Sequence, residues 1–146
     1  MASAVYANAK LLMATDSLGW VSPSTVFRGL LVKPTYAFNH VQTTVADVLG
    51  SEVAGGTYAR ADITGRVATL DLPGNRALCR AANVVFPLLS GVTATGLIIY
   101  RQIGGNDLTP GDDPLICFVD FPTTAATGLN YLIEFDPDGV FALTQC

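Results

Sequence analysis

The sequence predicts a mainly β protein, a single-domain antiparallel β-sandwich or partly closed barrel with an N-terminal helix. Short runs rich in Val, Ile, Leu and aromatic residues recur along the chain, and turns containing Gly, Pro and Asn separate them. The 146 residues contain no linker, composition break or internal repeat, and their number suits one domain of roughly 100 to 200 residues. We therefore expect one β-rich domain over residues 1–146, with residues 1–22 as a helical N-terminal arm.

The arm contains the main helical candidate. Ser3 can cap a short helix over residues 4–14. Its apolar residues fall at i, i+4, i+7 and i+8, which places them along one face: Val5, Ala9, Leu12 and Met13. A second short helix is expected over residues 43–49, because Gly50 is a natural stop.

After the Ser-Pro-Ser break at residues 22–24 the pattern becomes that of strands. The candidate strands are residues 26–33, 57–63, 67–72, 76–79, 84–86, 97–102, 115–121, 130–135 and 140–143. Residues 73–75 (Pro-Gly-Asn) and 136–139 (Asp-Pro-Asp-Gly) predict hairpins, because proline presets φ while glycine and asparagine tolerate positive φ. Residues 115–121 are apolar on both faces, so we expect that strand to be covered on both sides.

Composition and charge exclude several classes of protein. Only 14% of the residues are charged, against roughly 25% in an average soluble domain. The net charge is −4 and the arginines are scattered, whereas a nucleic-acid binder needs a basic face. No apolar run approaches the ~18 residues of a membrane span, and the N-terminus lacks the pattern of a secretory signal. We therefore expect neither nucleic acid nor a membrane as a partner.

The three cysteines form no CxxC motif and are odd in number. Cys79 and Cys117 lie inside apolar strand patterns, which indicates core packing. Synthesis in a reducing cytoplasm is the simplest interpretation.

A search for chemistry predicts no catalytic residue, no metal site and no cofactor. His40 is the only histidine, and no G-x-S-x-G elbow accompanies it. Glu52 and Glu134 could pair for glycoside cleavage, but Glu134 suits a solvent-facing or interface position better. The loop over residues 104–113 contains three aspartates without the spacing of a calcium loop, so we expect a solvated turn. No P-loop or G-x-G-x-x-G motif is present.

Several segments, taken in order, carry a resemblance to a known family. They are residues 7–12 (Ala-Asn-Ala-Lys-Leu-Leu), 18–20, 26–33, 51–58 (Ser-Glu-Val-Ala-Gly-Gly-Thr-Tyr), 82–86, 97–100, 114–121 and 132–143. Together these segments resemble small structural proteins of tailed-bacteriophage virions. Two features depart from that pattern. Arg60 and Asp62 stand where a glycine-rich turn and small residues are expected, and residues 104–113 form a long insertion between paired strands.

The resemblance implies a non-enzymatic virion component, made in the host cytoplasm. The leading expectation is a capsid decoration or cement protein, a homotrimer that stabilises the icosahedral head by binding the major capsid protein or other virion proteins. The alternative is a tail, neck or fibre-associated component. The low charge and high apolar content agree with a surface covered by other copies or another protein, although a monomer that buries its apolar residues internally stays possible. A carbohydrate-binding sandwich and a small hydrolase acting through Glu134 or His40 are further alternatives.

The arm and the 104–113 loop are the expected contact elements. The candidate interface residues are Val5, Tyr6, Leu11, Leu12, Trp20, Asp107 and Asp112. For Trp20 and the helix stripe, packing within the chain's own core is an equal expectation.

Overall fold

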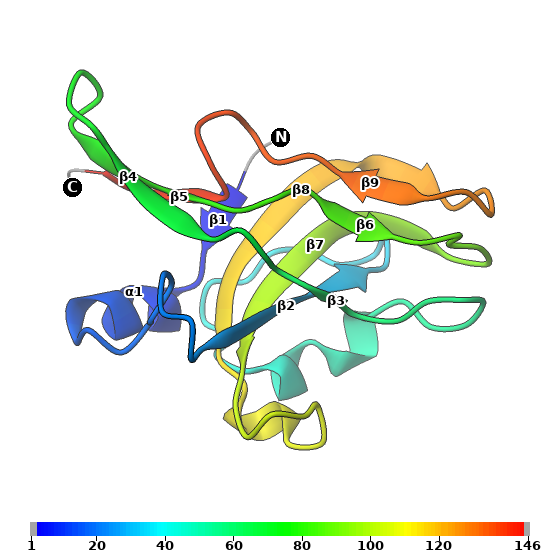
Figure 1. Cartoon of the computed structure of the whole chain (residues 1–146). Coiled ribbons are helices and arrows are strands. Elements are labelled where there is room, and N and C mark those ends of the chain that lie inside the picture. Colours follow the sequence, from blue (N-terminus) through cyan, green and yellow to red (C-terminus); the bar gives the residue numbers. More distant parts are fainter. Residues whose placement is uncertain (1–2, 145–146) are drawn as a thin grey trace.

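Within residues 3–144, which the computed structural model describes, the strands form three antiparallel sheets (Figure 1). The largest sheet has the order β1 (Ser3–Val5), β8 (Leu115–Ala125), β7 (Thr93–Gln102), β2 (Val26–Val32) and β3 (Ala61–Asp62). The second has the order β10 (Phe141–Thr144), β5 (Arg76–Arg80) and β4 (Val67–Asp71). The third pairs β6 (Val84–Phe86) with β9 (Tyr131–Ile133). The predicted mainly β class is confirmed, and because no sheet closes on itself, the sandwich alternative describes it.

Both faces of the five-stranded sheet are buried, so the core has two parts. One face packs against the other two sheets, through Phe27, Leu31, Leu97 and Ile99 against Cys79, Phe86, Ile133 and Phe141. The opposite face is covered by Tyr6 and by the segment after β2, through Val45 and Val48 against Leu30, Ile98 and Leu115. Residues 115–119 are buried without exception, which confirms that this strand is covered on both sides.

The predicted start of the N-terminal helix, at residue 4, is wrong. Residues 3–5 form β1, which pairs with β8 in the register Ala4 opposite Phe118, and the helix α1 (Ala7–Ala14) begins only after Tyr6. The edge of β8 offers ladder hydrogen bonds to this segment, and the Tyr6 side chain is fully buried with its hydroxyl 2.7 Å from that of Tyr36. Pairing with a distant strand therefore outweighs the local helical pattern. The predicted stripe does face the core, with Ala9 buried and Val5, Leu12 and Met13 partly buried against it.

Two other predicted elements are shorter than expected. The helix predicted over residues 43–49 is replaced by two 3₁₀ turns, Val45–Asp47 and Leu49–Ser51, the first closed by a Thr44–Asp47 capping box. The strand predicted over residues 57–63 shrinks to β3, because the edge of β2 beyond Gly29 is already occupied. There the Leu31 amide donates to the Tyr58 hydroxyl at 3.1 Å, and the Leu31 carbonyl accepts from the Val53 amide at 3.0 Å.

None of the helices among the described residues is long and apolar enough to cross a membrane. A further 3₁₀ turn, Pro110–Asp112, lies in the loop between β7 and β8.

Candidate functional site

An ion cluster joins the segment around β3 to the loop between β7 and β8. The cluster comprises Arg28, Glu52, Arg60, Asp62 and Asp107. Arg60 and Asp62 lie at or beside β3, and Asp107 comes from the loop after β7. The Arg28 guanidinium lies between them, donating to Asp62 at 2.8 Å and to Asp107. The cluster therefore links the 104–113 loop to the charged residues near β3 at the edge of the five-stranded sheet.

Arg60 is the most completely paired member of the cluster. Its Nε and Nη2 atoms each donate to Glu52 at 2.7 Å, and Nη1 donates to the Tyr100 hydroxyl at 3.2 Å. The hydrogen bonds to Glu52 raise the pKa of Arg60, so its charge is permanent. The Glu52 carboxylate also accepts from Tyr58 at 2.8 Å. Every charged group of the cluster therefore has an oppositely charged partner within the chain, as in a structural ion-pair network.

Asp107 is held as a carboxylate. Burial acts to raise its pKa, but hydrogen bonds from Tyr100 at 2.6 Å and Gln102 at 2.7 Å, together with Arg28 and Arg60, outweigh burial and lower the pKa. The Asp107 side chain is thus bound within the chain, and its role as a partner contact stays a prediction.

Asp113 lies in the same loop and has the opposite environment. It is fully buried, its Oδ1 accepts from the Ile103 amide at 2.8 Å, and its Oδ2 has no hydrogen-bond partner among the described residues. Burial raises the pKa of this carboxyl group. A buried charged oxygen without a partner is costly, so ionisation of Asp113 disfavours the fold.

We predict that Asp113→Asn raises stability relative to the wild type as the pH rises. A raised pKa in the folded state means that the folded chain binds more protons, so this group's contribution to stability falls as the pH rises above its unfolded value of about 3.9. Asparagine keeps the acceptor for Ile103 and removes that dependence. Urea unfolding at pH 4 and pH 7 tests this, and Asp112→Asn, at an exposed neighbour, is the matched control. A variant that loses stability on going from pH 4 to pH 7 as steeply as the wild type would contradict the prediction.

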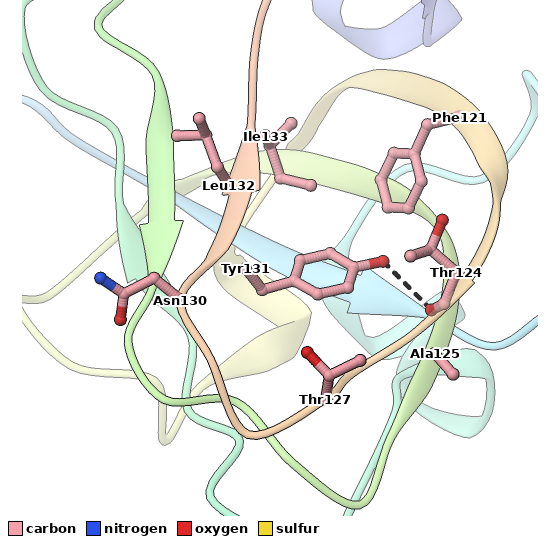
Figure 2. Close-up of a pocket in the computed structure, with 8 residues that line it drawn as sticks. All are labelled: Phe121, Thr124, Ala125, Thr127, Asn130, Tyr131, Leu132 and Ile133. Carbon is pink, nitrogen blue, oxygen red and sulfur yellow. Dashed lines mark hydrogen bonds between the residues drawn. The ribbon is translucent and has the colours of Figure 1, made fainter.

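A cavity of about 350 Å³ lies between the end of β8 and β9 (Figure 2). It is lined by Phe121, Thr124, Ala125, Thr127, Asn130, Tyr131, Leu132 and Ile133. The Tyr131 ring projects into it and donates its hydroxyl to the Thr124 carbonyl at 3.2 Å, while the Asn130 side chain accepts from the Leu88 amide at 3.1 Å. The lining contains no Asp, Glu, His, Lys or Arg, and its one titratable side chain is Tyr131. The Tyr131 hydroxyl and the Asn130 side-chain oxygen are already hydrogen-bonded to backbone groups of the chain.

The β4–β5–β10 sheet presents an apolar face that extends beyond the core. In Figure 1 the β4–β5 hairpin points away from the five-stranded sheet. The register places one set of side chains on a common face: Ala68, Leu70, Ala77, Cys79, Phe141 and Leu143. Cys79 and Phe141, at the inner end, are buried, whereas Leu70 is 72% exposed and Leu143 46% exposed. We call the outer part, Ala68, Leu70, Ala77 and Leu143, the apolar sheet face.

A hollow of about 240 Å³ separates this face from the N-terminal segment. Its lining is almost entirely apolar and includes Met13, Leu18, Trp20, Val21, Phe141 and Leu143, with Asp16 as its one charged residue. Trp20 closes the inner end by donating Nε1 to the Val67 carbonyl at 3.2 Å. Beyond this contact, β4 is the outer strand of its sheet, and residues 67–70 are exposed. The sheet therefore offers a partner both an apolar face and an open strand edge.

The predicted contact residues fall into four groups. Tyr6 and Trp20 are buried in the chain's own core, which for Trp20 was an equal expectation from the sequence. Asp107 is bound within the ion cluster. Val5 and Leu12 are partly buried against the core. Leu11 and Asp112 are exposed and available for contacts.

The residues singled out for chemistry lie apart from one another. His40 and Glu134 are both exposed, and Glu52 is bound to Arg60. Among residues 3–144 no group of His, Cys, Asp and Glu side chains is arranged to hold a metal ion. Cys79 and Cys117 are buried free thiols, as core packing requires, and burial raises the pKa of Cys79 to about 11.

The sequence did not predict the apolar sheet face. The alternation of residues 67–72, Val-Ala-Thr-Leu-Asp-Leu, is that of an ordinary half-buried strand. One feature distinguishes this strand: it has no lysine, the residue that protects many edge strands from pairing with other chains.

No protein-family model matches the chain, and neither the curated proteins nor the solved structures contain a match.

Proposed function

We propose that the chain is a non-enzymatic structural protein of a phage virion, a capsid decoration or cement protein that stabilises the icosahedral head by binding other copies and the major capsid protein. The observation that carries the proposal is the apolar sheet face with its open edge at β4. Such a surface gains free energy when a protein partner covers it. The ordered resemblance to phage virion proteins supports the location, and the surface supplies the means of attachment.

The work of such a protein is mechanical. It holds neighbouring shell subunits together by burying apolar surface and by pairing strands across their joints. Repeated symmetric contacts on a shell multiply a weak single contact through avidity. The paired charges of the ion cluster suit this role, because they fix the 104–113 loop without leaving a reactive group.

The copy number of this chain in purified particles tests the proposal. Quantitative mass spectrometry should find it at a number comparable to that of the major shell subunit. A number far below that would favour the tail, neck or fibre-associated alternative, and absence from the particle would refute a virion role. Particles assembled with the Leu70→Lys variant should lose most of the chain, whereas Leu129→Lys, at an exposed leucine between β8 and β9, should be incorporated normally.

A further inference from the structure

We propose that the open edge of β4 pairs with β4 of a second copy of this chain, antiparallel and across a two-fold axis, with Leu70 opposite Leu70 of the second copy. The inference rests on the assembly role proposed above, and it identifies a second copy of this chain as one of the binding partners. The result is one continuous six-stranded sheet made from two three-stranded ones.

The edge of β4 lacks the devices that keep strand edges apart. Natural proteins protect exposed edges with lysines, prolines or bulges, because a row of unpaired N–H and C=O groups is a template for another strand. Residues 67–71 contain neither lysine nor proline, and the pairing of β4 with β5 runs without a bulge. The single charge, on Asp71, is already bound to Arg76 at 2.7 Å. An unprotected edge of this kind selects a strand as its occupant.

The register points to a second copy rather than to an unrelated strand. Trp20 contacts the edge at Val67, which leaves Ala68, Thr69, Leu70 and Asp71 of β4 to pair. Antiparallel pairing centred on Leu70 places Thr69 opposite Asp71 of the second copy, and Ala68 then lies nearest to Leu72 of the second copy, the first residue after its β4. Leu70 and Ala68 lie on the apolar face, whereas Thr69 and Asp71 lie on the other. Each pair thus matches apolar with apolar or polar with polar, so the segment is complementary to itself.

The pairing also avoids the usual electrostatic penalty of self-association. Like charges placed directly opposite each other on paired strands are destabilising. Here each Asp71 faces a threonine, and Arg76 accompanies it as a counter-charge. Both copies contribute identical residues, as a two-fold interface requires. Leu70 and Leu72, which are 72% and 75% exposed, are then shared between the two chains.

The oligomeric state of the purified full chain tests the proposal. Sedimentation equilibrium over a wide concentration range should show a monomer–dimer equilibrium. Leu70→Lys should raise the dimer dissociation constant at least tenfold, because two lysines would meet at the two-fold axis. Leu129→Lys, at a leucine that is 69% exposed and lies between β8 and β9, should leave that constant unchanged. Far-UV circular dichroism should show both variants folded, since neither side chain lies in the core.

A disulfide trap reports the register directly. Opposed Cα atoms in an antiparallel pair lie about 4.5–5.5 Å apart, within the disulfide range of about 4.4–6.8 Å. In a Cys146→Ser background, Leu70→Cys should therefore form a covalent dimer under mild oxidation, and Leu129→Cys should not.

A chain that stays monomeric at every concentration would overturn the pairing, and so would a dimer indifferent to Leu70→Lys. The homotrimer expected from the resemblance would overturn it too, because an isologous β4 contact closes at two copies. These outcomes separate the two proposals. A monomer that is abundant in particles leaves the virion role intact, whereas a β4 dimer absent from particles leaves the pairing intact and removes the virion role.

Discussion

Replacing Trp20 with alanine is expected to lower the free energy of unfolding by about 3–5 kcal/mol, the usual cost of removing a buried large aromatic side chain. Trp20 is 5% exposed, and its ring meets those of Phe27 at 5.1 Å and Phe141 at 5.0 Å in edge-on contacts. Its Nε1 hydrogen bond also joins the N-terminal segment to the first residue of β4. The substitution therefore removes packing between two sheets and releases the segment that closes the edge of β4.

Urea unfolding followed by far-UV circular dichroism measures this loss, since the variant has no tryptophan left for fluorescence. Val21→Ala, at the next residue and 60% exposed, is the matched control and should change stability by less than about 0.5 kcal/mol. If Trp20→Ala instead kept its stability and lost only its association with other chains, Trp20 would be a partner contact, as the sequence alone allowed.

The sequence predicts the strands well where the evidence is local. β4, β5 and β6 lie within one residue of their predicted bounds, because the turn chemistry of residues 73–75 defines the hairpin and apolar alternation defines its strands. The double burial of residues 115–119 was equally predictable, since both faces of that segment are apolar.

Prediction fails where a distant segment decides the outcome. Residues 3–5 fit a helix by pattern, yet the edge of β8, more than a hundred residues away in sequence, makes them a strand. Residues 57–60 look like part of a strand, yet the Leu31 amide donates its hydrogen bond to the Tyr58 hydroxyl instead of to a strand partner, and the pairing of β3 with β2 stops at Gly29. Tertiary context overrides a weak local preference in both cases.

The candidate site was also only partly predictable, because distant segments determine its position. The low charge and high apolar content agree with a covered surface, but the sequence analysis placed the expected contacts on the N-terminal arm and the 104–113 loop. An alternating strand such as β4 can pack its apolar face on the core or extend beyond the core. The position of its hairpin in the fold decides between the two, and the alternation of residues does not reveal that position. The ion cluster was equally hidden, because its members come from four separate segments of the chain.

Arg60→Ala is expected to destabilise the fold by about 1.5–3 kcal/mol, because it removes charge-assisted hydrogen bonds and leaves the partly buried Glu52 carboxylate without its cation. The Arg60 and Glu52 side chains are only 12% and 14% exposed, and the pair is bidentate. The substitution leaves Glu52 with the Tyr58 hydroxyl but without its cation. It also removes a charge 3.6 Å from Asp107, which loosens the 104–113 loop.

The double variant Glu52→Gln/Arg60→Ala separates this effect from simple loss of packing. It should recover part of the stability that Arg60→Ala loses, since the stranded charge is gone while the glutamine still accepts from Tyr58. Arg80→Ala, at an exposed arginine, is the matched control and should stay within about 0.5 kcal/mol of the wild type. Guanidinium would screen these charges, so urea is the denaturant to use. A loss below about 1 kcal/mol for Arg60→Ala would mean that the pair behaves like a surface salt bridge, and that the 104–113 loop is held by the backbone contacts of Asp113 instead.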